Sequence, residues 1–100
     1  MHKLLVLYPP PNDAGHFRNY YANTHVPLVN KIPGLRSFRY GLDARGMGAD
    51  SPYFGVAELE FDSADAMEAA LDSSDGQATI GDVPNYATGG AVVLHYELAE

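Results

Sequence analysis

The order of the hydrophobic patterns along the chain is the feature that most limits its fold. Apolar runs of strand length occupy residues 2–8, 35–45, 53–61 and 91–98, and turn-forming residues separate them. Apolar residues at helical spacing lie between the first and second runs, and again between the third and fourth. The predicted order is therefore strand, helix, strand, strand, helix, strand.

This order is typical of the split βαβ, or ferredoxin-like, architecture. We therefore expect an α+β fold in which two helices cover one face of a four-stranded antiparallel sheet. A chain of 100 residues has the length of a single domain, which we place at residues 1–100.

The first helical pattern follows Asn12 and Asp13, and either side chain suits the N-cap position. One face of this pattern repeats at the spacing of a buried helix stripe: Phe17, Tyr20, Tyr21, Thr24, His25 and Leu28. Pro27 lacks an N–H and disfavours the helical conformation of the residue before it. We therefore expect this helix to end near residues 23–25, and a short second turn to run from Pro27 to about Lys31.

The second helical pattern begins after Ser63, which suits an N-cap, and its apolar residues lie within residues 66–71. Asp75-Gly76 is expected to interrupt it. We expect another helical turn at residues 77–80 and a loop over residues 81–90.

The predicted strands are too apolar for a sheet with one face in water. The first and last strands are apolar on both alternating sets, and the middle strands add Phe38, Tyr40, Phe54 and Val56. Some of these side chains must lie on the helix-free face, and a large exposed apolar face indicates an interface or a ligand site. We therefore expect a homodimer that packs two helix-free sheet faces together and leaves a cavity between them.

Composition excludes several classes of partner. The formal net charge of −7 disfavours binding to nucleic acid or to an anionic membrane surface. There is no cysteine, hence neither a disulfide framework nor a thiolate zinc site, and the composition suits a cytoplasmic protein. We identify no signal peptide and no apolar run of the ~20 residues that span a bilayer.

Several segments together carry a resemblance to a known family: Asp13, Phe17, Tyr20 and Tyr21, then Thr24–Leu28, Lys31–Leu35, Phe54–Phe61 and Asp82–Tyr86. With them, nearly the whole chain resembles the EthD-like family of the dimeric α+β barrel superfamily. The resemblance implies a homodimer whose sheets form a barrel, a small apolar pocket in each protomer, and neither a metal nor an organic cofactor. Members of the family are tied to ether degradation, lactone isomerisation and fungal polyketide tailoring.

His25 is the candidate catalytic residue. It lies near the C-terminus of the first predicted helix, where the helix dipole favours the protonated imidazole, whereas burial favours the neutral one. These opposed effects can hold its pKa near neutrality, which suits a general acid or base. The resemblance also places a histidine of this kind at the pocket. The alternative is a histidine that caps carbonyl groups at a helix end.

The candidate ligand-binding residues are four aromatic side chains and a second histidine: Tyr8, Tyr21, Tyr40, Phe54 and His95. The hydroxyl groups suit a polar ligand atom, but buried tyrosines also serve as core mass. His95 interrupts an apolar strand, where a core or interface role is the alternative. Arg36 and Arg39 point to opposite faces of their strand, so at most one of them points inward. The histidines at 2 and 16 are expected at the surface.

A metal site is not predicted, because the four histidines do not follow a known ligand spacing. The expected function is cofactor-independent proton transfer on a small apolar or aromatic carbonyl compound: isomerisation, cyclisation, dehydration or decarboxylation. In this interpretation His25 is the base, and a tyrosine hydroxyl or an arginine stabilises the enolate. Two alternatives stay open: a non-catalytic ligand-binding or accessory protein of an oxidase or degradation system, and a cofactor-free oxygenase.

Overall fold

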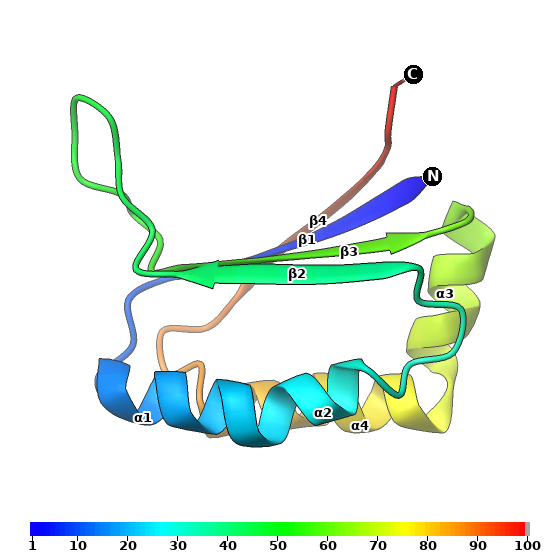
Figure 1. Ribbon diagram of the computed structural model, residues 1–100, viewed down its shortest axis with the longest axis horizontal. Helices are drawn as coiled ribbons and strands as arrows, with labels where there is room; N and C mark the ends of the chain where they lie inside the picture. Colours follow the sequence, from blue (N-terminus) through cyan, green and yellow to red (C-terminus); the bar gives the residue numbers. More distant parts are fainter. Residues whose placement is uncertain (100) are drawn as a thin grey trace.

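The computed structural model describes residues 1–99 and has the predicted order of elements (Figure 1). The strands form one antiparallel sheet in the order β2-β3-β1-β4. Their bounds are β1 His2–Tyr8, β2 Ser37–Leu42, β3 Gly55–Phe61 and β4 Val92–Glu97. The α-helices are α1 Ala14–Tyr20, α2 Val26–Val29, α3 Ala64–Asp72 and α4 Ser74–Asp82. Because α1, α2 and α4 lie along one face of the sheet, with α3 descending to them from its end, the α+β fold class is confirmed (Figure 1).

The register of the central strand β1 decides which side chains face the helices. Leu4 lies opposite Leu59 of β3 on one side and opposite His95 of β4 on the other. The set that contains Leu4 and Tyr8 is buried beneath the helices together with alternate residues of β3. The remaining set forms the helix-free face, whose apolar members are Leu5, Leu7, Val56, Val92, Leu94 and Tyr96.

The first helix does not end at residues 23–25, which corrects the expectation from the sequence. A π-helical turn, η1 (Tyr21–His25), joins α1 to α2 without a break, and the Val26 N–H donates to the Tyr21 carbonyl. Pro27 falls in the first turn of α2, where its missing N–H is tolerated. The wider π turn adds a residue before it, so the proline changes the helix geometry instead of ending the helix.

The second helical region is capped as expected but is interrupted elsewhere. The Ser63 hydroxyl accepts a hydrogen bond from the Ala66 N–H, while the interruption falls at Ser73 and not at Asp75-Gly76. Ser73 has an extended backbone, and its hydroxyl caps α4 by accepting from the Gly76 N–H. A Cβ at Gly76 would lie 2.2 Å from a carbonyl oxygen of α3, so this close turn requires glycine.

The segment expected as a loop over residues 81–90 is partly helical. α4 continues to Asp82, and a 3₁₀ turn, η2 (Val83–Asn85), follows it directly. The next residue, Tyr86, is 1 % exposed and packs in the core against the rings of Phe17 and Tyr21. Helical structure therefore fixes the position of Asp82 and Tyr86 relative to the sheet. Within residues 1–99, no helix has the length and apolar character to cross a bilayer.

Candidate functional site

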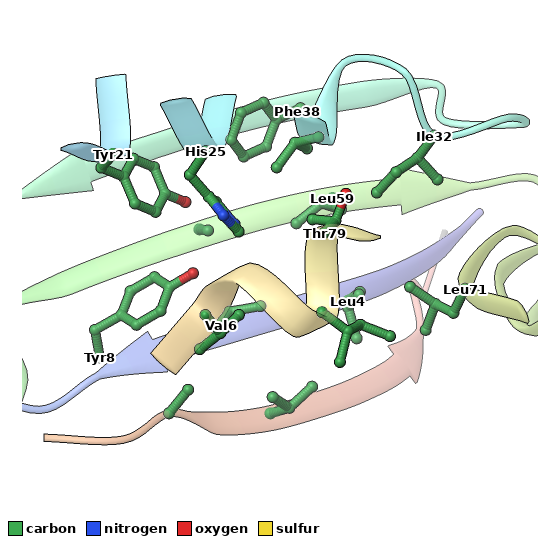
Figure 2. A pocket seen from close by; sticks show the side chains of 16 residues that line it. Leu4, Val6, Tyr8, Tyr21, His25, Ile32, Phe38, Leu59, Leu71 and Thr79 are labelled. Carbon is green, nitrogen blue, oxygen red and sulfur yellow. The ribbon is translucent and has the colours of Figure 1, made fainter. Parts of the chain in front are cut away.

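A cavity of about 320 Å³ lies between the sheet and the helices (Figure 2). It is enclosed by a single chain, unlike the cavity between two sheets that the strand patterns suggested. Its wall is largely aliphatic: Leu4, Val6, Ala57, Leu59, Ala91 and Val93 from the sheet side, and Val29, Ile32, Leu71, Ile80 and Val83 from the helical side. Val93 and Ile80 are 56 % and 47 % exposed, so the cavity opens to solvent between β4 and α4.

One end of the cavity is polar. Tyr8 from β1 and Tyr21 and His25 from η1 line it, and Figure 2 shows both tyrosine hydroxyls directed toward the same region beside the imidazole. All three side chains are buried. The structure thus brings together three of the six side chains that the sequence singled out. The fourth polar lining residue, Thr79, already donates its hydroxyl to the Asp75 carbonyl at 2.8 Å.

His25 is held by a side chain at each ring nitrogen. Its Nδ1 lies 2.9 Å from Oδ2 of Asp82, and its Nε2 lies 3.0 Å from the Tyr86 hydroxyl. The Tyr86 hydroxyl is in turn 2.8 Å from the hydroxyl of Tyr8. These groups form a continuous chain of hydrogen bonds from the buried carboxylate to the cavity wall. The alternative of a histidine that only caps helix carbonyls does not describe these contacts.

Asp82 is fixed from three directions. Besides His25, the Tyr20 hydroxyl donates to its Oδ1 at 2.5 Å and the Asn85 amide donates to the same oxygen at 2.9 Å. Burial opposes ionisation of this carboxyl, but the hydrogen bonds from Tyr20, Asn85 and His25 outweigh it and lower its pKa below the ordinary value. Asp82 is therefore an ionised, acceptor-only partner at neutral pH.

The protonation states give the hydrogen-bond chain a direction. Burial lowers the pKa of His25 more than Asp82 raises it, so the imidazole is neutral at pH 7. Because Asp82 only accepts, Nδ1 carries the proton and Nε2 presents a lone pair. Tyr86 then donates to Nε2 and accepts from Tyr8, and burial raises the pKa of both phenols, which keeps them protonated. His25 is thus a neutral imidazole with its basic nitrogen facing the tyrosine chain.

Tyr40 and Phe54 do not line the cavity, contrary to their predicted position as pocket walls. Tyr40 projects toward the helices from the edge strand β2, is 40 % exposed, and packs with its ring centroid 4.8 Å from that of Tyr21. Tyr21, and not Tyr40, therefore lines the cavity. Phe54 precedes β3, and its ring packs edge-on against Phe17 at 5.0 Å. In both cases an aromatic side chain of the α1–η1 segment packs against the ring.

His95 also lies outside the cavity. Its Nδ1 is 2.9 Å from Nε2 of His2, and it lies on the edge strand β4, which is exposed along its length. His2 is 6 % exposed, which corrects the expectation that it is a surface residue, whereas His16 is exposed as expected. The two histidines near the termini therefore pair with each other and not with the cavity.

Neither candidate arginine points inward. Arg36 forms a bidentate pair with Asp62 at 2.9 and 2.7 Å, and both side chains are more than half exposed. Arg39 lies opposite Glu58 on the helix-free face. Among residues 1–99, no Lys or Arg lines the cavity. Within residues 1–99, no three His, Cys, Asp or Glu side chains form a group that could hold a metal ion.

Sequence reasoning missed the two residues that hold His25. Neither Asp82 nor Tyr86 is among the predicted site residues, and their segment is predicted as part of a loop. The available signal was its composition, since an aspartate, an asparagine and a tyrosine within five residues bring three hydrogen-bonding side chains to one turn. Nothing in their spacing joined them to His25, which is 57 residues away from Asp82 in the sequence.

The family model of the EthD domain matches residues 10–90. The chain belongs to the EthD family. It is 33% identical over 94 residues to an uncharacterized 11.0 kDa protein in the thcB-thcC intergenic region of Rhodococcus erythropolis, covering 94% of this chain and 91% of that protein.

Solved structures of the same fold include close matches. An EthD family protein from Bacillus halodurans superposes with a TM-score of 0.91 at 30% identity, covering 99% of each chain. A hydroxynitrile lyase from Passiflora edulis superposes with a TM-score of 0.78 at 16% identity, covering 99% of this chain and 94% of that one. Several further matches are described as dimeric ferredoxin-like proteins. At their low identities, the lyase and these dimeric proteins show the shared fold alone.

Proposed function

We propose that this EthD protein is a cofactor-independent enzyme that transfers a proton in a small apolar or aromatic carbonyl compound. The observation that carries the proposal is a buried, neutral His25, held between Asp82 and Tyr86 at the polar end of an otherwise apolar cavity. A histidine whose two ring nitrogens have different partners has a defined basic nitrogen, which is what general base catalysis needs.

The basic nitrogen reaches the cavity through two phenols. A proton that leaves the substrate passes to the Tyr8 oxygen as Tyr8 gives its own proton to Tyr86 and Tyr86 gives its proton to Nε2 of His25. The imidazolium formed in this way is stabilised by the ionised Asp82. The return of the proton along the same chain completes an isomerisation or an elimination without another reactant.

The developing negative charge falls on the substrate oxygen. The Tyr21 hydroxyl lies beside the imidazole at the same end of the cavity (Figure 2), and a hydrogen bond from it stabilises an enolate or alkoxide. The sequence left open whether a tyrosine or an arginine stabilises the enolate, and we assign this role to Tyr21. The hydroxynitrile lyase of the same fold supports this only as an example of lyase chemistry on this scaffold.

We also propose that the protein is a homodimer through the helix-free sheet face. Three apolar side chains of β4 on this face, Val92, Leu94 and Tyr96, are 39–48 % exposed, and water-exposed apolar patches of this kind favour association. Beside them, Lys3 forms an ion pair with Glu58, which gives the interface a charged part. The description of several proteins of this fold as dimeric supports the proposal.

Exchange of carbon-bound protons in deuterated water tests the proposed enzyme. Small ketones and aldehydes would be incubated with the protein, and the loss of the proton signals next to the carbonyl would be followed by ¹H NMR. We expect faster exchange with the wild-type protein than with the His25→Gln variant. Binding of these compounds without any acceleration of exchange would contradict the enzyme and favour the alternative of a ligand-binding accessory protein.

A further inference from the structure

The polar end of the cavity holds one hydrogen-bond donor and one acceptor that a ligand can reach. The donor is the Tyr21 hydroxyl, whose side chain is only 1 % exposed and which interacts with the Tyr8 hydroxyl without a hydrogen bond of full geometry among residues 1–99. No fully buried side-chain oxygen or nitrogen in the same residues lacks a partner. The Tyr21 hydroxyl therefore faces the open space of the cavity, as Figure 2 shows.

The acceptor is the Tyr8 oxygen. Tyr86 donates its proton to the lone pair on Nε2 of His25, so its oxygen can only accept from Tyr8. The Tyr8 hydroxyl therefore donates its own proton to Tyr86. Tyr8 therefore has no donor left for a ligand, but its oxygen retains a lone pair. Toward a ligand, Tyr21 is therefore a hydrogen-bond donor and Tyr8 an acceptor. They differ because the hydrogen bonds from Tyr8 through Tyr86 to His25 run in one fixed direction.

We propose that this tyrosine pair recognises a hydroxyl group on an uncharged ligand. A hydroxyl accepts from Tyr21 and donates to Tyr8 at the same time, whereas a carbonyl or ether oxygen accepts from Tyr21 and leaves the Tyr8 oxygen unpaired. The proposal rests on the proposed function, because it identifies the hydroxyl-bearing form of the carbonyl compound, such as an enol or a carbonyl adduct, as the form that binds.

The remaining wall excludes charged ligands. In the part of the chain that the structure describes, the cavity lining contains no Lys or Arg and its only ionisable base is the neutral His25, while the Thr79 hydroxyl already donates to a backbone carbonyl. A carboxylate or phosphate would lose its hydration without gaining a cation. The volume of about 320 Å³ lies at the small end of ligand pockets, which span roughly 300–1,000 Å³. The ligand class is therefore small, neutral hydroxyl compounds with an apolar body.

Three probes that share one ring test this selectivity: benzyl alcohol, benzaldehyde and benzoate. Their dissociation constants would be measured by NMR titration of the wild-type protein and of the Tyr21→Phe variant. The Tyr53→Phe variant is the matched control, because Tyr53 lies in the segment before β3 and does not line the cavity. The substitution at Tyr21 keeps the aromatic ring and hence the packing against Phe17 and Tyr86.

We expect the wild-type protein to bind the alcohol about tenfold more tightly than the aldehyde, and benzoate more weakly than either. Tyr21→Phe is expected to remove most of the preference for the alcohol, and Tyr53→Phe to keep it. Equal affinities for alcohol and aldehyde, an unchanged preference in Tyr21→Phe, or no binding of any probe would each overturn the proposal. Selective binding of the alcohol without proton exchange would contradict the proposed function alone.

Discussion

Two histidine clusters in this chain each join an imidazole to a carboxylate, and they differ in burial. At the cavity, His25 and Asp82 are 3 % and 8 % exposed, and both ring nitrogens of His25 and both carboxylate oxygens of Asp82 have a protein partner. At the end of the sheet, His2 contacts Glu97, whose side chain is 62 % exposed, and Glu97 also pairs with the terminal ammonium of Met1. The same side-chain chemistry therefore occurs in two different dielectric surroundings.

The difference shows that the surroundings, and not the histidine itself, distinguish the candidate site. Hydrogen bonds from His2 and the terminal ammonium lower the pKa of Glu97, yet water screens this cluster. Around His25, burial governs the pKa of the imidazole and keeps it neutral beside an ionised carboxylate. Of the two clusters, the one at His25 has an imidazole whose basic nitrogen is defined by its partners and an adjoining cavity.

The largest expected difference between the clusters is in activity. In the proton-exchange assay, we expect His25→Gln to lower the rate by about 10²–10⁴-fold, which is the usual contribution of a general base. His95→Gln breaks the contact with His2 but leaves the cavity intact, so we expect its rate to stay within about twofold of wild type. Comparable losses in the two variants would show that the cavity cluster has no special role.

The second largest expected difference is in how much each carboxylate, Asp82 or Glu97, contributes to the stability of the protein. We expect Asp82→Ala to lower the free energy of unfolding by about 2–3 kcal/mol, because it leaves buried partners of a charged acceptor unpaired. Glu97→Ala, at an exposed position, should leave the unfolding midpoint unchanged within error. Urea denaturation of both variants at pH 7 measures the difference. A larger loss for Glu97→Ala would reverse the assignment of the buried network.

The smallest expected effect is the pH dependence of stability. The pKa of His25 is lower in the folded protein than in the unfolded chain, where it is near 6.5. The unfolded state therefore binds more protons as the pH falls below 6.5, and His25 should contribute a loss of stability of at most about 1.4 kcal/mol per pH unit. The His25→Gln variant should lack this contribution in urea denaturation between pH 7 and 5, and His95→Gln should retain it.

Much of the fold could be predicted from the sequence, because hydrophobic period and turn residues are local. The order of strands and helices along the chain and the Ser63 cap follow from residues close together in the chain. The π turn could not be predicted, because the usual effect of Pro27 is to end a helix, and only packing of the α1–α2 segment on the sheet decides otherwise.

The candidate site was only partly predictable for a similar reason. His25, Tyr8 and Tyr21 stand out as polar groups in apolar patterns, but the partners of His25 come from the far end of the chain. His95 stands out in the same way, yet it lies on the exposed edge strand β4 and contacts His2 instead of the cavity. Periodicity places a residue on a face of the sheet, but not under a particular helix.

Titration of His25 by NMR tests the central claim most directly. The Cε1–H signal, assigned by its absence in His25→Gln, would be followed from pH 8 to pH 4 in the wild-type protein. The burial of His25 predicts a midpoint below 6.5, so that the imidazole is neutral at pH 7. In Asp82→Asn, which removes the carboxylate that raises this pKa, the midpoint should fall further. A wild-type midpoint above 7 would show an imidazole that is mostly charged at pH 7 and contradict a neutral base at the cavity.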